Sequence, residues 1–75
     1  MGNFPNIDII ATGQNIVKLR KNAGLTVADL QTIFGFSSPQ AIYKWQKGLC
    51  LPTVDNLVVL SIVFNTTIDG ILILS

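Results

Sequence analysis

Four polar side chains recur at a helical spacing in the middle of the chain. They are Gln40, Tyr43, Lys44 and Lys47. Positions i, i+3, i+4 and i+7 share one face of an α-helix, so the four are expected on one stripe. Glutamine can pair with adenine N6 and N7, lysine with guanine O6 and N7, and tyrosine can reach a phosphate or a thymine methyl. The stripe therefore suits the major groove of DNA, although a plain solvated helix face has the same composition.

A second basic group stands earlier in the chain, at Lys18, Arg20 and Lys21. We expect it at the end of a helix, where cations complement the negative end of the helix dipole. It could also reach the DNA backbone, so that both basic groups serve one surface. Without a partner, the same residues would be an ordinary feature of a helix end.

Composition allows one domain and predicts self-association. The 75 residues are 49% hydrophobic and only 12% charged, against about 25% charged in an average soluble domain. The net charge is +1, so the argument for a nucleic-acid partner depends on where the charges lie. Asp29, Asp55 and Asp69 each follow a threonine by two or three residues, where a carboxylate stabilises a helix N-terminus. Only Asp8 lacks such a role, so the basic residues face few competing acids.

Several kinds of chemistry lack the residues they need. Cys50 is the one cysteine and there is no histidine, so a single chain can build neither a disulfide nor a Cys/His zinc site. With no glutamate and no glycine-rich phosphate loop, we expect no enzyme, no metal, no cofactor and no small-molecule ligand. The apolar stretch at residues 57–68 is shorter than the roughly 18 to 20 residues of a membrane span. A cytoplasmic protein without a membrane partner is the expectation.

The periodicity of the chain predicts an N-terminal arm and five helices. Residues 1–13 hold Pro5 and two glycines among scattered apolar residues, which indicates an arm, followed by a helical domain over residues 14–75. The first helix is expected from residue 14 to 22, the second from 27 to 34, the third from 39 to 47, the fourth from 54, and the fifth from 68 toward 74. The expected N-caps of the last four are Thr26, Ser38, Thr53 and Thr67.

The order of several spaced residues resembles the phage-repressor and Cro-like (XRE-type) helix-turn-helix family, over about residues 12–74. The residues that carry the resemblance are Leu25-Thr26, Leu30, Gly35-Phe36-Ser37, Ile42, Trp45, Gly48 and Pro52. The run at residues 39–46 is similar to a subgroup of short bacterial regulators. The resemblance implies an all-α, five-helix, lambda-repressor-like domain that regulates transcription, in which the second and third helices form the helix-turn-helix and the third lies in the major groove. It places Ser38, Gln40, Ala41, Tyr43, Lys44 and Lys47 at the DNA interface.

The sequence departs from this family at a few positions. The turn before Ile42 is one residue longer than the common pattern, and Val27 stands where many members carry a phosphate-contacting glutamine. Gln46 replaces an acid that in relatives pairs with an arginine at the position of Arg20. We therefore expect at most a hydrogen bond from Arg20 to the neutral acceptor of Gln46, which would leave Arg20 freer for phosphate.

Apolar residues cover more of the last two helices than one domain can bury, which predicts a homodimer. The expected contact residues are Val59, Ile62, Val63, Ile71, Ile73 and Leu74. A twofold dimer would read a near-palindromic DNA site. The alternative is a protein-interaction module that retains the helix-turn-helix fold without binding DNA.

Overall fold

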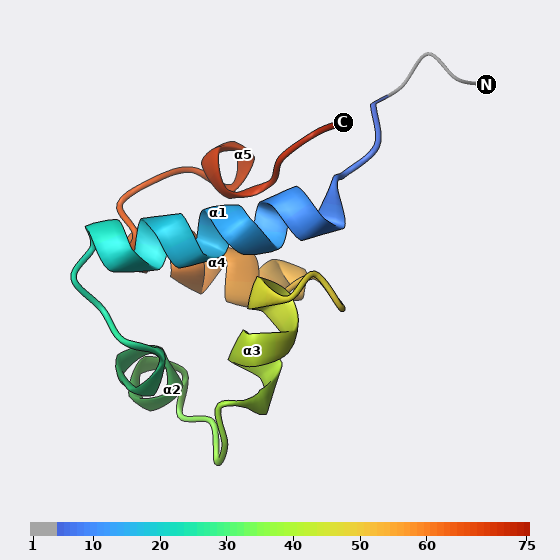
Figure 1. Ribbon diagram of the computed structural model, residues 1–75. Helices are drawn as coiled ribbons and strands as arrows, with labels where there is room; N and C mark the ends of the chain where they lie inside the picture. Colours follow the sequence, from blue (N-terminus) through green and yellow to red (C-terminus); the bar gives the residue numbers. More distant parts are fainter. Residues whose placement is uncertain (1–4) are drawn as a thin grey trace.

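The computed structural model describes residues 5–75, which form five α-helices around one core (Figure 1). They are α1 (Ile9–Asn22), α2 (Val27–Phe34), α3 (Gln40–Gln46), α4 (Val54–Val63) and α5 (Ile68–Ile71). In Figure 1, α1 crosses the middle of the molecule, with α5 on one side of it, α2 and α3 on the other, and α4 behind it. The all-α, five-helix class is therefore confirmed for the described residues. None of these helices has the length and apolar character that crossing a membrane requires.

Helix α1 begins at Ile9, five residues before the expected start at Gln14, so that prediction was wrong. The reason is Asp8, whose carboxylate accepts a hydrogen bond from the backbone nitrogen of Ala11 at 3.0 Å and so caps the helix. Asp8 was expected to lack a structural role, and this too was wrong. Part of the predicted arm, residues 1–4, lies outside the described residues.

Gly13 lies inside α1, against the backbone at the end of α3. A Cβ atom on Gly13 would meet the carbonyl oxygens of Trp45 and Gln46, the latter at 2.7 Å. A glycine that looks like a helix breaker in the sequence is thus required by the contact between two helices.

The helix-turn-helix segment follows its local signals with one exception. Thr26 and Asp29 form the predicted capping box at the start of α2, and Gly35 ends that helix in the left-handed conformation (φ 70°). The predicted cap of α3 was wrong, because Pro39 occupies the N-cap position and no side chain caps it. Ser38 Oγ lies 3.5 Å from the backbone nitrogen of Gln40, which is long for a hydrogen bond.

The last two helices begin where the sequence predicts, at the N-caps Thr53 and Thr67. Helix α5 ends at Ile71, however, instead of reaching toward Leu74. The chain beyond it is extended because α1 and the segment before it supply hydrogen bonds. Thr12 Oγ1 accepts from the backbone nitrogen of Ile73 at 2.9 Å, and the Asp8 nitrogen donates to the Ile73 carbonyl at 2.7 Å.

The core draws residues from all five helices. Its buried apolar members are Ile16, Leu30, Ile42, Trp45, Leu57, Leu60, Phe64 and Ile71. Ile71 is completely inaccessible, so its predicted place in a dimer contact was wrong. The short helix α5 packs on α1 and α4, and this packing encloses Ile71 within the protomer.

Candidate nucleic-acid interface

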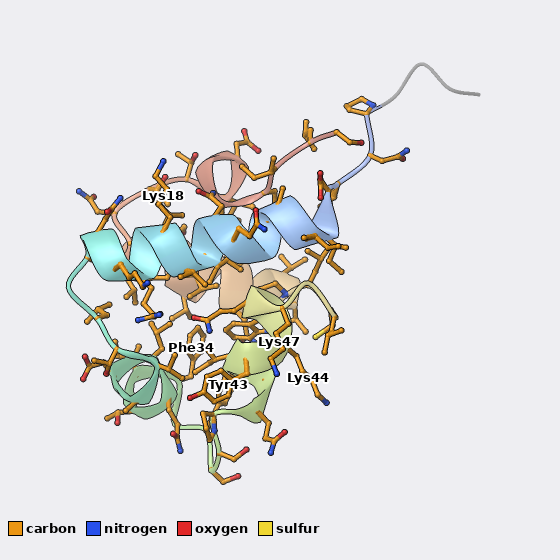
Figure 2. All side chains as sticks on the ribbon, viewed as in Figure 1. Lys18, Phe34, Tyr43, Lys44 and Lys47 are labelled. Carbon is orange, nitrogen blue, oxygen red and sulfur yellow. The ribbon has the colours of Figure 1, made fainter. Side chains whose placement is uncertain are left out.

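Helix α3 has one face in the core and one in solvent. Ile42 and Trp45 are 0% and 3% exposed, whereas the residues of the predicted stripe are all exposed. These are Gln40, Tyr43, Lys44 and Lys47. Figure 2 shows Tyr43, Lys44 and Lys47 projecting from α3, with Tyr43 on the side nearer α2. The four side chains thus form one accessible polar surface, as their spacing predicts.

An aromatic cluster holds α3 in position against α2 and the turn that joins them. The ring of Phe34 stacks on that of Phe36 with centroids 4.9 Å apart. Trp45 meets Phe34 and Phe36 edge-on, at 5.5 and 6.0 Å. Such aromatic pairs add about 0.5 to 1.5 kcal/mol each beyond the burial of their area. The cluster therefore fixes how the exposed face of α3 is presented relative to α2.

An open hollow of about 460 Å³ lies beside the exposed face of α3. It is lined by Phe36, Ser37, Ser38, Gln40, Ala41, Lys44 and Cys50. The structure thus brings together four of the predicted interface residues and adds three that we did not predict. The added residues are Phe36 and Ser37 from the turn and Cys50 from the loop after α3. Turn and loop positions have no periodicity, so only the chemical type of these residues could have indicated a role.

Arg20 is half-buried and held by two hydrogen bonds. Its Nε donates to the amide oxygen Oε1 of Gln46 at 3.0 Å, which agrees with the expected neutral acceptor. Its Nη1 also donates to the carbonyl oxygen of Leu25 at 2.8 Å. The expectation that Arg20 would be freer was therefore wrong, because the guanidinium joins α1 to α3 and to the loop before α2.

Lys18 lies away from α3. Asn15, three residues before Lys18, donates to the carbonyl oxygens of Gly70 and Ile71 at 2.8 and 3.0 Å, so this side of α1 adjoins α5. Figure 2 places Lys18 on the side of α1 opposite to α3. Lys21 is exposed in the last turn of α1. Lys18 thus does not share one surface with the stripe on α3, contrary to our expectation.

The four acids all lie at helix N-termini, and none of them lies on α3. Asp8 caps α1, while Asp29, Asp55 and Asp69 lie in the first turns of α2, α4 and α5. The backbone and side-chain hydrogen bonds of Thr26 hold the pKa of the Asp29 carboxyl below its ordinary value. Because α3 has no acid in its first turn, its exposed face carries cations without a neighbouring carboxylate on the same helix.

A helix-turn-helix family model matches residues 16–71, which is most of the chain. No curated protein and no solved structure matches this protein. The matched residues include the capping box of α2, the turn at Gly35, all of α3 and all of α4. The chain therefore belongs to the phage-repressor and Cro-like (XRE-type) helix-turn-helix family of DNA-binding transcription regulators.

Proposed function

We propose that the protein binds double-stranded DNA as a homodimer, with α3 in the major groove of a near-palindromic site. The observation that carries the proposal is the exposed polar face of α3, which the aromatic cluster holds on a buried core. In this proposal Gln40 and Lys44 contact bases, because their side chains suit adenine and guanine edges. Tyr43 and Lys47 contact phosphates.

The proposed DNA interface contains fewer residues than the one expected from the sequence. It comprises Ser38, Gln40, Ala41, Tyr43, Lys44 and Lys47. The proposal leaves out Lys18, which lies on the side of α1 opposite to α3, and with it Lys21. It assigns Arg20 a positioning role because of its bonds to Gln46 and Leu25.

The outer face of α4 supports the homodimer. Val54, Val58 and Ile62 are spaced four residues apart and are 71%, 44% and 74% exposed. Asp55 is the single charged residue within α4. Rows of side chains spaced by four pack against each other when two helices cross, so a second copy of α4 is a suitable partner for this stripe. Of the residues expected in the dimer contact, the proposed contact retains Ile62. Val59 and Val63 are half-buried and lie at the border of the exposed stripe.

In the proposed dimer the two α4 helices face each other, and the polar face of α3 stays open to DNA. The twofold relation predicts an inverted repeat whose half-sites are about 34 to 36 Å apart. Pairing also doubles the five lysines and arginines of one chain, which raises affinity because each neutralised phosphate releases counterions.

The proposal is tested by enriching bound fragments from a random DNA pool and then titrating the selected site at several salt concentrations. Two double variants are compared, Gln40→Ala with Lys44→Ala on α3 and Gln14→Ala with Lys18→Ala on α1. Both pairs join a glutamine to a lysine four residues later, and all four side chains are exposed. We expect the α3 variant to lose affinity by about 5- to 150-fold or more, since a good base contact contributes about 1 to 3 kcal/mol.

The α1 variant is expected to bind like the unchanged protein. Equal losses in the two variants, or an affinity that does not change with salt, would contradict the proposal. A protein-interaction module without DNA binding is the alternative that the exposed α4 stripe favours. It would show as a stable complex with another protein together with no binding to DNA fragments at low salt.

A further inference from the structure

The hollow beside α3 lies where one small side chain adjoins two long ones. Gln40 and Lys44 are four residues apart on the exposed face, and Ala41 next to them projects only a methyl group. Ala41 packs in part on the core. Phe36 and Cys50 close the hollow from the turn before α3 and the loop after it. Three separate segments therefore shape one concave surface.

The wall at Phe36 is fixed by contacts within the protein. The backbone nitrogen of Phe36 donates to the Gln31 carbonyl at 3.1 Å, and Gln31 Nε2 donates to the Phe36 carbonyl at 3.3 Å. The ring of Phe36 also stacks on the ring of Phe34. This wall is in place before any ligand arrives.

The wall at Cys50 depends on how the chain leaves α3. Gly48 adopts the left-handed conformation (φ 71°), which glycine reaches without steric cost. The backbone nitrogen of Leu49 donates to the Lys44 carbonyl at 3.0 Å. This turn carries the chain back along α3, so that Cys50 lies beside Ala41 and Lys44 at the hollow.

The lining combines apolar and polar groups in a way that matches one base edge. Phe36, Ala41 and Cys50 contribute carbon and sulfur surface, and cysteine behaves as a small apolar residue. Gln40 and Lys44 contribute donors at the same hollow. In the major groove only thymine presents an apolar group, its C5-methyl, and it does so beside the O4 acceptor.

We propose that this hollow receives the methyl edge of a thymine, so that the half-site contains a thymine next to the bases contacted by Gln40 and Lys44. The inference rests on the proposed function and assigns Ala41, Phe36 and Cys50 to specificity. Contact with the methyl adds to the hydrogen bonds of the polar pair, and the selected site must therefore contain an A·T pair.

The test replaces each thymine of the selected site, one at a time, by deoxyuridine, which removes only the methyl group. We expect one position per half-site to lose affinity by about fourfold, the factor for burying one methyl-sized group. In the Cys50→Ser variant, the thymine and deoxyuridine sites should bind with nearly equal affinity, because the apolar wall of the hollow becomes polar. Deoxyuridine without effect at every position would overturn the inference, as would a loss that Cys50→Ser leaves unchanged.

A second measurement uses the single thiol of the chain. Cys50 is exposed in the free protein, and bound DNA should slow its alkylation by a maleimide at least tenfold. The Gln40→Ala/Lys44→Ala double variant at the same DNA concentration is the control and should keep the fast rate. An unprotected thiol in a DNA complex would contradict the placement of the hollow at the bases. Absence of any DNA binding would instead contradict the proposed function, so the two failures are distinguishable.

Discussion

Gly13 of α1 faces the backbone carbonyl of Trp45 in α3, and the space between them does not admit a Cβ atom. The contact joins the longest helix to the helix that carries the proposed DNA surface. Because the opposing atoms belong to the backbone of α3, they cannot move aside as a flexible side chain would. The position of α3 relative to α1 therefore depends on the absence of a single methyl group.

Gly13→Ala is expected to destabilise the protein. Alanine is favoured over glycine within a helix by about 1 kcal/mol, but overpacking a tight interior costs about 1 to 3 kcal/mol. The cost of overpacking should exceed the gain in helix propensity, because backbone atoms oppose the new methyl group. Thermal unfolding followed by circular dichroism would measure the loss. Gln14→Ala, at the next and exposed position of α1, is the control and should leave the midpoint unchanged or slightly raised.

Gln46→Glu is expected to stabilise the fold, because the charged Arg20 guanidinium, which now donates to a neutral amide oxygen, would pair with a carboxylate. Ion pairs between exposed side chains contribute about 0.2 to 1 kcal/mol. Since both side chains are half-buried, solvent screens the pair only in part, and a gain of about 0.5 to 1 kcal/mol is expected. Urea unfolding at low and high salt would test it, with Gln14→Glu on the exposed side of α1 as control. A gain in that control of equal size would show that the effect does not come from Arg20.

Acidification is expected to weaken α2 through its capping box. The pKa of Asp29 is lowered below 3.8, first by the backbone hydrogen bond from Thr26 and then by the Thr26 side chain. A carboxyl group with a lowered pKa in the folded state contributes stability above its unfolded-state pKa and loses it as the pH falls through the folded-state pKa. The contribution should therefore be complete near neutral pH, begin to fall as the pH approaches about 4, and be lost below the folded-state pKa.

The measurement for α2 is the urea midpoint at pH 6 and at pH 3. Asp29→Asn should lose less stability between these two values than the unchanged protein. Thr26→Ala should give an intermediate result, because it removes the side-chain hydrogen bond and keeps the backbone nitrogen as a donor. An Asp29→Asn variant with the full pH dependence would show that other groups cause the acid loss.

Ile62→Asp is expected to convert the proposed homodimer into a monomer. Ile62 is 74% exposed on the outer face of α4, so the charge costs little in the monomer but would be buried without a partner charge in the dimer. Sedimentation equilibrium would measure the association. Ile33→Asp on α2 is the matched control, since Ile33 is also an exposed isoleucine, at 46%. A monomeric unchanged protein, or equal dissociation of both variants, would contradict an interface on α4.

Local signals allowed much of the helix-turn-helix to be predicted. Thr26, Thr53 and Thr67 each cap the helix that follows, and Gly35 ends α2 as expected. Caps and terminators act through hydrogen bonds within about four residues, so they can be recognised without knowing the fold. The two faces of α3 were predictable for the same reason, because helical spacing alone separates Trp45 from Lys44.

The remaining features depend on which segments meet across the fold. Gly13 interrupts the local helical pattern of α1, and only its contact with the backbone of Trp45 explains why a glycine lies there. Ile71 was predicted to lie on the surface, but it is buried. The residues next to Ile71 in the chain do not indicate how far α1 and α4 enclose α5.

By itself, then, the sequence determined the family, the caps of α2, α4 and α5, and the polar face of α3, since these depend on residue type and short spacing. Only the tertiary structure separated Lys18 from the face of α3 and brought Cys50 to the hollow beside Ala41. The rotation of α1 about its axis and the path of the loop after α3 decide these distances. Both are set by side-chain packing between segments far apart in the chain, which no local pattern encodes.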